Sequence, residues 1–315
     1  MTRPDAQTPD DKVRPDDHVI EIKSLKKWFD NDQGQRQTVL DNVTFNVRRG
    51  ETIIIMGGSG CGKSTLLNCL IGEYDVDHGQ VFYRTKDMEK PLNIVGMSEE
   101  DLNQIRKKFA ILFQSGALFN SMTLGENVAL PLREHSQVEE SVIDIVVTLK
   151  LQQVNMLPHR DKLPSQLSGG QKKRAGLARA TVMDPEIIFY DEPSAGLDPV
   201  TSATIDELII DLSKKLHVTS VVVTHEMDSA FRIADRMVML DRGKVLKIGD
   251  RKEFEALRDA DPKSLKSRDE QLMNQFLNGR TEGPLTGEES LTEFDQALIS
   301  GGEENRNGNA AARSV

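Results

Sequence analysis

Long hydrophobic runs are missing from this chain of 315 residues. No apolar stretch approaches the roughly 20 residues that a helix needs to cross a bilayer, so any role at a membrane is expected to depend on a partner. Residues 1–17 mix proline with aspartate and lack the apolar segment of a secretory signal peptide. We therefore expect a cytosolic location.

Cysteine is scarce as well, because the chain has only Cys61 and Cys69. These two residues lie on one predicted loop and helix, and they fit neither a disulfide framework nor a set of zinc ligands. Reduced thiols, as in cytosolic proteins, are the expectation.

Extended basic clusters are also absent. The net charge is -10, the isoelectric point is about 5.2, and no lysine or arginine cluster exceeds a few residues. The sequence therefore lacks the basic footprint of a nucleic-acid-binding protein. It does have enough apolar residues, 37%, to fill the core of one large domain or two small ones.

Strands and helices are predicted to alternate along most of the chain. Apolar runs and alternating patterns predict strands, and apolar residues spaced by three and four predict helices between them. This order is typical of an α/β fold with a mostly parallel sheet covered on both faces. The predicted strands are 19–22, 39–47, 52–56, 79–83, 109–113, 187–190, 220–223, 237–240 and 245–248.

A more helical region is predicted from about 115 to 170. Within it, Val142, Ile145, Val146 and Leu149 have the i, i+3, i+4, i+7 spacing of one helix face. We interpret these four residues as a stripe that packs into the core.

A glycine-rich loop between the strand 52–56 and a predicted helix has the order of a P-loop. Its glycines allow successive backbone N–H groups to face a concave surface at the partially positive end of the helix, so a polyphosphate fits. Lys63 is predicted to reach the β- and γ-phosphates of ATP, and the Ser64 hydroxyl to bind Mg²⁺. The loop residues are Gly57, Gly58, Ser59, Gly60, Cys61, Gly62, Lys63, Ser64 and Thr65.

The strand 187–190 ends in two carboxylates, Asp191 and Glu192. Ligands of parallel sheets bind beyond the carboxyl ends of the strands, which places both side chains near the P-loop. Asp191 is predicted to hold Mg²⁺, and Glu192 to act as general base or orienting group for the water that attacks the γ-phosphate.

The segment Leu167-Ser168-Gly169-Gly170-Gln171 resembles the signature sequence of ATP-binding cassette (ABC) ATPases. It opens a predicted helix, so its N–H groups and the Ser168 hydroxyl form a second anion site without a ligand of its own. This second site predicts a head-to-tail homodimer in which each signature covers the ATP on the other subunit. The resemblance extends over about 19–249. It implies a P-loop NTPase fold with a small antiparallel β subdomain and an inserted helical subdomain, about 115–170.

Four further positions match the same family. Gln114 resembles the Q-loop residue, which touches Mg²⁺ and the attacking water and also acts as a hinge. His225 resembles the switch histidine that hydrogen-bonds the γ-phosphate, and Asp198 belongs to a segment similar to the D-loop at the dimer interface. Phe29 occupies the place of the aromatic residue that stacks on adenine, with Trp28 as the rival.

A narrower resemblance is to the ATPase subunit of the Mla system and its Mce-linked relatives, which move phospholipids or other lipids between bacterial membranes. The residues that carry it are 112–119, 126–135, 164–168, 196–202, 275–279 and 282–284. It implies two ATPase copies on the cytoplasmic face of the inner membrane, bound to an integral membrane permease (MlaE-like). It also implies a periplasmic MCE-domain lipid-binding protein and, in some relatives, a small STAS-domain protein.

The resemblance predicts one ABC ATPase domain over 18–283, between a disordered tail at 1–17 and a disordered acidic tail at 284–315. Two alternatives stay open. The chain could power an importer for another small solute, or it could be an ABC ATPase without a transport role, although the long inserts of that class are missing between the P-loop and Asp191.

Overall fold

The structure, a computed structural model, describes residues 18–31, 34–281 and 283–285. The predicted tail 1–17 and nearly all of the predicted tail 284–315 lie outside these residues. Two compact units are distinguished, Met1–Arg251 and Lys252–Val315. The limits 18–283 for a single domain stay a prediction.

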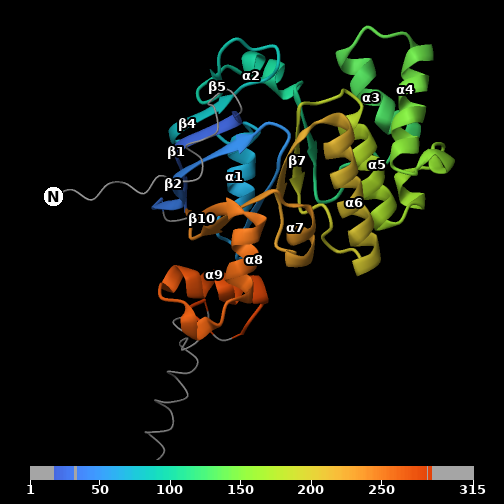
Figure 1. Cartoon of the computed structure of the whole chain (residues 1–315). Helices are drawn as coiled ribbons and strands as arrows, with labels where there is room; N and C mark the ends of the chain where they lie inside the picture. Colours follow the sequence, from blue (N-terminus) through green and yellow to red (C-terminus); the bar gives the residue numbers. More distant parts are fainter. Residues whose placement is uncertain (1–17, 32–33, 282, 286–315) are drawn as a thin grey trace, which may run out of the picture. The chain divides into compact units, whose positions relative to one another are not determined.

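Two sheets form the first unit (Figure 1). A four-stranded antiparallel sheet has the order β2-β1-β4-β5, and a six-stranded sheet has the order β10-β9-β3-β8-β7-β6. In the larger sheet only β10 runs antiparallel to its neighbour. The strands are β1 (His18–Asp30), β2 (Arg36–Arg48), β3 (Thr52–Gly57), β4 (His78–Tyr83), β5 (Leu92–Asn93), β6 (Phe109–Leu112), β7 (Ile187–Asp191), β8 (Thr219–Val223), β9 (Arg236–Asp241) and β10 (Lys244–Asp250).

The helices of this unit fill the connections between the strands. They are α1 (Lys63–Leu70), α2 (Glu99–Arg106), α3 (Leu124–His135), α4 (Glu140–Gln153), α5 (Gly169–Thr181), α6 (Pro199–Leu216) and α7 (Met227–Ile233), with short 3-10 turns at Leu157–His159 and Pro164–Gln166. None of the helices within the described ranges is long and apolar enough to cross a membrane.

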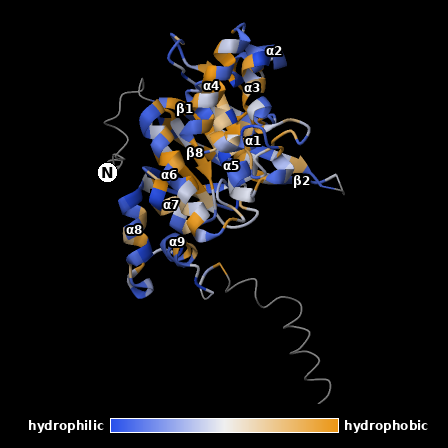
Figure 2. Ribbon diagram, turned by 90° about the vertical axis from the view of Figure 1, so that its right-hand side faces the viewer, coloured by the Kyte–Doolittle hydropathy of each residue, from blue (hydrophilic) through white to orange (hydrophobic). Residues whose placement is uncertain are grey.

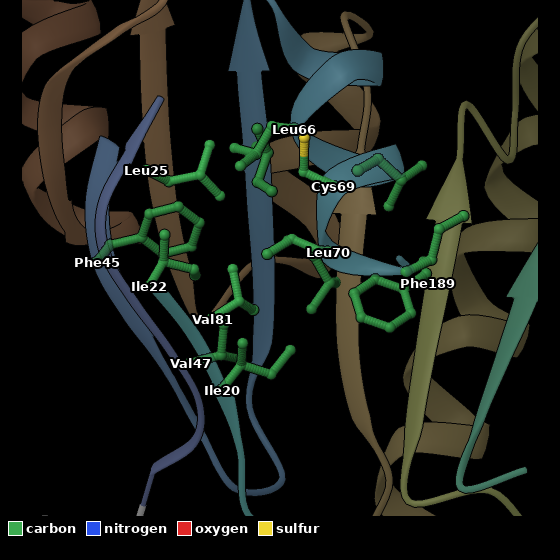
Figure 3. Packing of buried hydrophobic residues seen from close by; sticks show 14 of the residues in the cluster. Ile20, Ile22, Leu25, Phe45, Val47, Leu66, Cys69, Leu70, Val81 and Phe189 are labelled. Carbon is green, nitrogen blue, oxygen red and sulfur yellow. The ribbon is translucent and has the colours of Figure 1, made fainter. Parts of the chain in front are cut away.

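The main core lies where α1 is enclosed by the two sheets. Figure 3 shows Ile22, Leu25 and Phe45 of the antiparallel sheet pointing toward α1, with Phe189 of β7 on the other side. Leu66 and Leu70 of α1 are fully buried between them. All six residues of β3 are buried, as expected for a central parallel strand. The P-loop therefore starts from a fully buried central strand.

The other face of the larger sheet is covered by helices of mixed polarity (Figure 2). Ser213 of α6 links two strands there, since its hydroxyl lies 3.3 Å from Thr52 Oγ1 on β3 and 3.2 Å from Ser220 Oγ on β8. The parallel sheet, the antiparallel subdomain and the helical insertion confirm the predicted fold class.

The helical subdomain corrects one prediction. Val142, Ile145 and Leu149 are 45%, 59% and 54% exposed, and Val146 is only half-buried. The face of α4 that packs inward instead carries Ile143, Val147 and Leu151. α4 therefore has two apolar stripes, and spacing alone does not tell which of them meets α3 and α5.

Asn127 of α3 fixes the loop that enters this subdomain. Its fully buried amide accepts a hydrogen bond from the N–H of Phe119 and donates to the carbonyl groups of Phe119, Met122 and Thr123. Residues 119–123 are thus attached to α3.

The second unit contains most of α8 (Arg251–Asp259), a 3-10 turn (Pro262–Ser264) and α9 (Arg268–Asn278). Asn274 of α9 caps the end of α8, because its side-chain amide donates to the carbonyl groups of Leu257, Arg258 and Ala260. The N–H of Leu285 donates to Gln275 Oε1 at 2.8 Å, which places the first residues of the predicted C-terminal tail beside α9. These helices were not predicted from the sequence.

Candidate nucleotide-binding site

The P-loop joins the end of β3 to α1, as predicted. Gly57 and Gly62 have φ values of +151° and +106°, a region that disfavours side chains. A Cβ at Gly57 would lie 2.2 Å from the carbonyl oxygen of Leu240, and one at Gly62 would lie 2.8 Å from Leu40 Cδ2. Glycine is therefore required at both positions, for space as well as for conformation.

The first turn of α1 is open to an anion. Its N-cap residue is Gly62, which has no side chain to accept hydrogen bonds from the first N–H groups of the helix. Ser59, Gly60 and Ser64 are exposed, while Thr65 is half-buried. Lys63 Nζ donates to the carbonyl groups of Gly57 at 2.8 Å and Gly58 at 3.0 Å. The lysine thus lies over the loop where a phosphate would be bound.

Asp191 ends β7 at the same edge of the sheet. β7 pairs with β8, and β8 pairs with β3, so that Asp191, Val223 and Ile55 follow one another across the sheet. Burial raises the pKa of the Asp191 carboxyl, and the charge of Glu192 raises it further, whereas Lys173 and Lys63 lower it. The strand register therefore places Asp191 at the same edge of the sheet as the P-loop that follows β3.

The oxygen atoms available at this edge suit Mg²⁺. A hydroxyl at Ser64 and a carboxylate at Asp191 are hard ligands of the kind that hold Mg²⁺ together with substrate phosphates. Across the described parts of the chain there is no group of three or more His, Cys, Asp and Glu residues that could bind a metal without such help.

Glu192 and His225 contact each other directly. His225 Nδ1 lies 2.8 Å from Glu192 Oε1, and the backbone N–H of His225 donates to Oε2 at 3.3 Å. Glu192 has a left-handed backbone with φ +48°, and its N–H donates to the carbonyl of Val223. Two of the three predicted catalytic residues, Glu192 and His225, are therefore brought together at the ends of β7 and β8.

Gln114 follows β6 by two residues, and its side chain is exposed. β6 runs parallel to β7, so Gln114 emerges at the same edge as Asp191. The backbone just after it is held by α5, because Arg179 donates to the carbonyl groups of Gly116 and Ala117.

Phe29 and Trp28 have different surroundings on β1. The Phe29 ring is 39% exposed, lies edge-on to Tyr74 at 5.5 Å between centroids, and has Lys27 Nζ 5.0 Å from its centre. Arg36 lies 5.1 Å from the centre of the Trp28 ring. Tyr74 comes after the C-terminal end of α1, so Phe29 contacts the segment that leaves this helix.

The signature residues form the N-terminus of α5. Ser168 is the N-cap: its Oγ accepts from the N–H of Gln171, and Gln171 Oε1 accepts from the N–H of Ser168. Ser168 and Gly169 are exposed, while Gly170 is buried. This capping box keeps the first turn in shape with its outer side open.

Asp198 lies next to the signature as the N-cap of α6. Its carboxylate accepts from the N–H groups of Val200 and Thr201 and from the Thr201 hydroxyl, and these bonds lower its pKa. A Cβ at Gly170 would lie 2.4 Å from Thr201 Cγ2, so the two helix ends are in close contact. Asp198 therefore fixes the start of α6, against which the signature end of α5 packs.

Lys173 of α5 was missed by the sequence analysis. It is 5% exposed, and its Nζ donates to the carbonyl oxygen of Glu192 at 2.9 Å. The available signal was its spacing, since Lys173 falls on the helix face of Gly170 and Leu177, both buried. A lysine at a buried helix position needs a partner.

A groove of about 610 Å³ lies between α2 and β6 on one side and α3 and α5 on the other. Its lining combines the cations Arg106, Lys107 and Arg179 with apolar residues such as Phe109 and Pro131. Pro131 and His135 belong to the segment 126–135, one of those that carry the resemblance to the Mla ATPase subunit.

Comparison with known proteins agrees with this geometry. Residues 40–195 match the family model described as ABC transporter. The chain is 39% identical over 279 residues to the "Probable ribonucleotide transport ATP-binding protein mkl" of Mycobacterium leprae, covering 89% of this chain and 74% of that protein. The chain belongs to the ABC transporter family.

This family membership identifies the chain as an ATP-hydrolysing subunit. It is 37% identical over 263 residues to the "Intermembrane phospholipid transport system ATP-binding protein MlaF" of Escherichia coli, covering 84% of this chain and 91% of that protein. A dimeric ATP-binding cassette, MJ0796, solved with ADP and Pi, superposes with a TM-score of 0.66 at 29% identity, covering 74% of this chain and 98% of that one. The ABC cassette fold and ATP as substrate are thus established.

Proposed function

We propose that this ABC ATPase powers the transport of phospholipids or related lipids between the inner and outer membranes, through ATP-driven closure of a head-to-tail homodimer. The observation that carries the dimer is the exposed, capped N-terminus of α5, an anion site that is separate from the P-loop. The similarity to MlaF over nearly its whole length supports the cargo.

Lys63, Glu192 and Gln114 would have separate roles in ATP hydrolysis. Lys63 would leave the carbonyl groups of Gly57 and Gly58 and bind the β- and γ-phosphates as a point charge. Glu192, oriented by His225, would accept a proton from the attacking water or align it. Gln114 would contact the same water from the end of β6.

Ser64, Asp191 and Gln114 would hold Mg²⁺, which supplies charge neutralisation at the phosphates when it is bound. Phe29 would stack on adenine, because its ring is 39% exposed and stacking needs an exposed π face. The partner's Ser168, Gly169, Gly170 and Gln171 would cover the γ-phosphate, with Asp198 nearby on the same surface.

A permease helix would dock in the groove between α2, β6, α3 and α5. The groove joins the sheet to the helical subdomain, so closure of the dimer would change its width and move the docked helix. Coupling of this kind is reciprocal, and the permease should therefore alter the affinity for ATP. An MlaE-like permease would hold the subunit at the cytoplasmic face of the inner membrane. A periplasmic MCE-domain protein, and in some systems a STAS-domain protein, would complete the assembly.

The dimer is tested with Glu192→Gln. This variant keeps the shape of the site but loses the base, so we expect it to bind ATP and dimerise while turnover falls by about 100-fold or more. Sedimentation velocity with and without Mg-ATP measures the dimer, and phosphate release measures turnover. Near-normal turnover would remove Glu192 from its role, and a monomer at saturating ATP would contradict the dimer. Lys63→Ala should instead lose nucleotide affinity.

The mycobacterial relatives support a second cargo, since their name assigns ribonucleotide transport. Purification of the tagged protein from its native membrane, followed by analysis of bound proteins and lipids, separates the candidates. A permease that co-purifies with phospholipid supports lipid transport. A permease whose complex turns over faster with ribonucleotides than with lipid supports the second cargo. Absence of any permease would favour an ABC ATPase without a transport role.

A further inference from the structure

Lys173 connects two functional parts of one chain. It belongs to α5, the helix that begins at the signature, and its ammonium group donates to the carbonyl oxygen of Glu192 at the end of β7. At 1.5 Å per residue, Lys173 lies only about 7.5 Å along the helix from Ser168. A displacement of the signature end is therefore transmitted directly to Lys173.

The backbone of Glu192 is held in an unusual conformation. Its φ of +48° lies in the left-handed region, which residues with a side chain adopt only when their surroundings impose it. The N–H of Glu192 donates to Val223, and its carbonyl accepts from the N–H of Ala195 and from Lys173 Nζ. Lys173 is the member of this set that comes from α5.

Burying the ammonium group of Lys173 costs free energy unless nearby groups compensate for its charge. The side chain is 5% exposed, and burial lowers its pKa, while the charges of Glu226, Glu192 and Asp191 raise it. These three carboxylates come from β7 and from the loop after β8, and they compensate for the buried ammonium. The hydrogen bond, however, goes to the Glu192 backbone and not to a carboxylate.

We propose that Lys173 is a positioning residue that sets the backbone of Glu192 according to the position of the signature end of α5, so that each subunit hydrolyses its own ATP only after its signature has closed on the partner's ATP. The inference rests on the proposed dimer. It makes Lys173 a link within one chain between the two nucleotide sites.

The test compares Lys173→Met, which keeps the length of the side chain but removes its N–H donors, with Lys172→Met on the half-exposed neighbouring position. We expect Lys173→Met to lower kcat about 10-fold or more and to change KM for ATP less than about twofold, because ATP still binds. Lys172→Met should leave both values near wild type. Lys173→Arg, which retains a cationic donor, should recover part of the lost kcat.

A second measurement separates positioning from damage to the signature. Combined with Glu192→Gln, Lys173→Met should dimerise with Mg-ATP as well as Glu192→Gln alone, whereas Ser168→Arg in the same background should not dimerise. An unchanged kcat would overturn the proposal. So would a loss of ATP-dependent dimerisation equal to the loss of turnover.

Folding is checked by melting temperature, and Lys173→Gln is measured alongside because the uncharged amide is a milder change. If neither Met nor Gln at this position folds, Lys173 is a stability residue and the proposal is wrong. Failure of Glu192→Gln itself to dimerise would count against the proposed function, while a fall in kcat without a matching change in KM in Lys173→Met would still decide whether the lysine acts on Glu192.

Discussion

The two helix N-termini at which this ABC ATPase presents N–H groups are built differently. α1 begins at Gly62, without a side-chain cap, and its loop is wedged against Leu240 and Leu40 of the same chain. α5 begins at Ser168, has a complete capping box, and exposes Ser168 and Gly169. The first end is a cradle formed by one chain, and the second is an open, preformed surface that we propose is completed by a second subunit.

This difference explains why the two ends tolerate different residues. The P-loop needs glycine where its backbone approaches its own chain, while the signature needs glycine where α5 touches α6. Alanine substitutions of neighbouring glycines, within the P-loop and within the signature, therefore test this difference between the two helix ends most directly.

The largest effect is expected for Gly57→Ala. The new Cβ would lie 2.2 Å from the Leu240 carbonyl at a φ of +151°, so the loop must distort and ATP affinity should fall about 100-fold or more. Gly58→Ala is the control, because nothing lies within 4 Å of its added Cβ. Titration with a fluorescent ATP analogue measures both. Equal affinities for the two variants would show that steric fit at Gly57 does not shape the cradle.

A smaller effect is expected for Gly170→Ala, whose Cβ would lie 2.4 Å from Thr201 Cγ2. Monomer affinity for ATP should stay near wild type, but in a Glu192→Gln background dimerisation should weaken by about 10-fold, since α5 must shift. Gly169→Ala is the comparison, because a Cβ added at Gly169 would meet only Leu197 Cδ2 of its own chain, at an ordinary contact distance of 3.5 Å. Thr201→Ser removes the clashing methyl and keeps the hydroxyl bound to Asp198, so it should restore dimerisation to Gly170→Ala. A double variant as weak as Gly170→Ala would contradict the steric explanation.

The smallest effect on ATP binding is expected for substitutions in α4 of the helical subdomain. Leu151→Ala, at a fully buried position, should lower the free energy of unfolding by about 2–5 kcal/mol, while Leu149→Ala, at a position 54% exposed, should change it by less than about 0.5 kcal/mol. Both should bind ATP normally. Urea unfolding compares them, and a larger loss for Leu149→Ala would restore the stripe that the sequence predicted.

Motif residues could be predicted because their chemistry is local. Strand, glycine loop and helix fix the P-loop within nine residues, and the carboxylates at 191 and 192 follow a strand whose direction the alternation already implies. The stripe at Leu149 could not be placed, because α4 carries a second stripe through Leu151 and the choice between them depends on α3 and α5. The spacing of Lys173 indicated a buried position, but its partner could not be predicted, because that partner is a backbone carbonyl 19 residues away in the sequence.

The attachments around Gln114 have a mechanical consequence. On one side, β6 is hydrogen-bonded into the sheet up to Leu112. On the other side, Arg179 donates hydrogen bonds to the carbonyl groups at 116 and 117, and Asn127 donates to those of Phe119, Met122 and Thr123. Any rotation of the helices as a rigid body must then be absorbed by the dihedral angles of residues 113–115. The glutamine that would sense the nucleotide is thus the middle residue of the pivot.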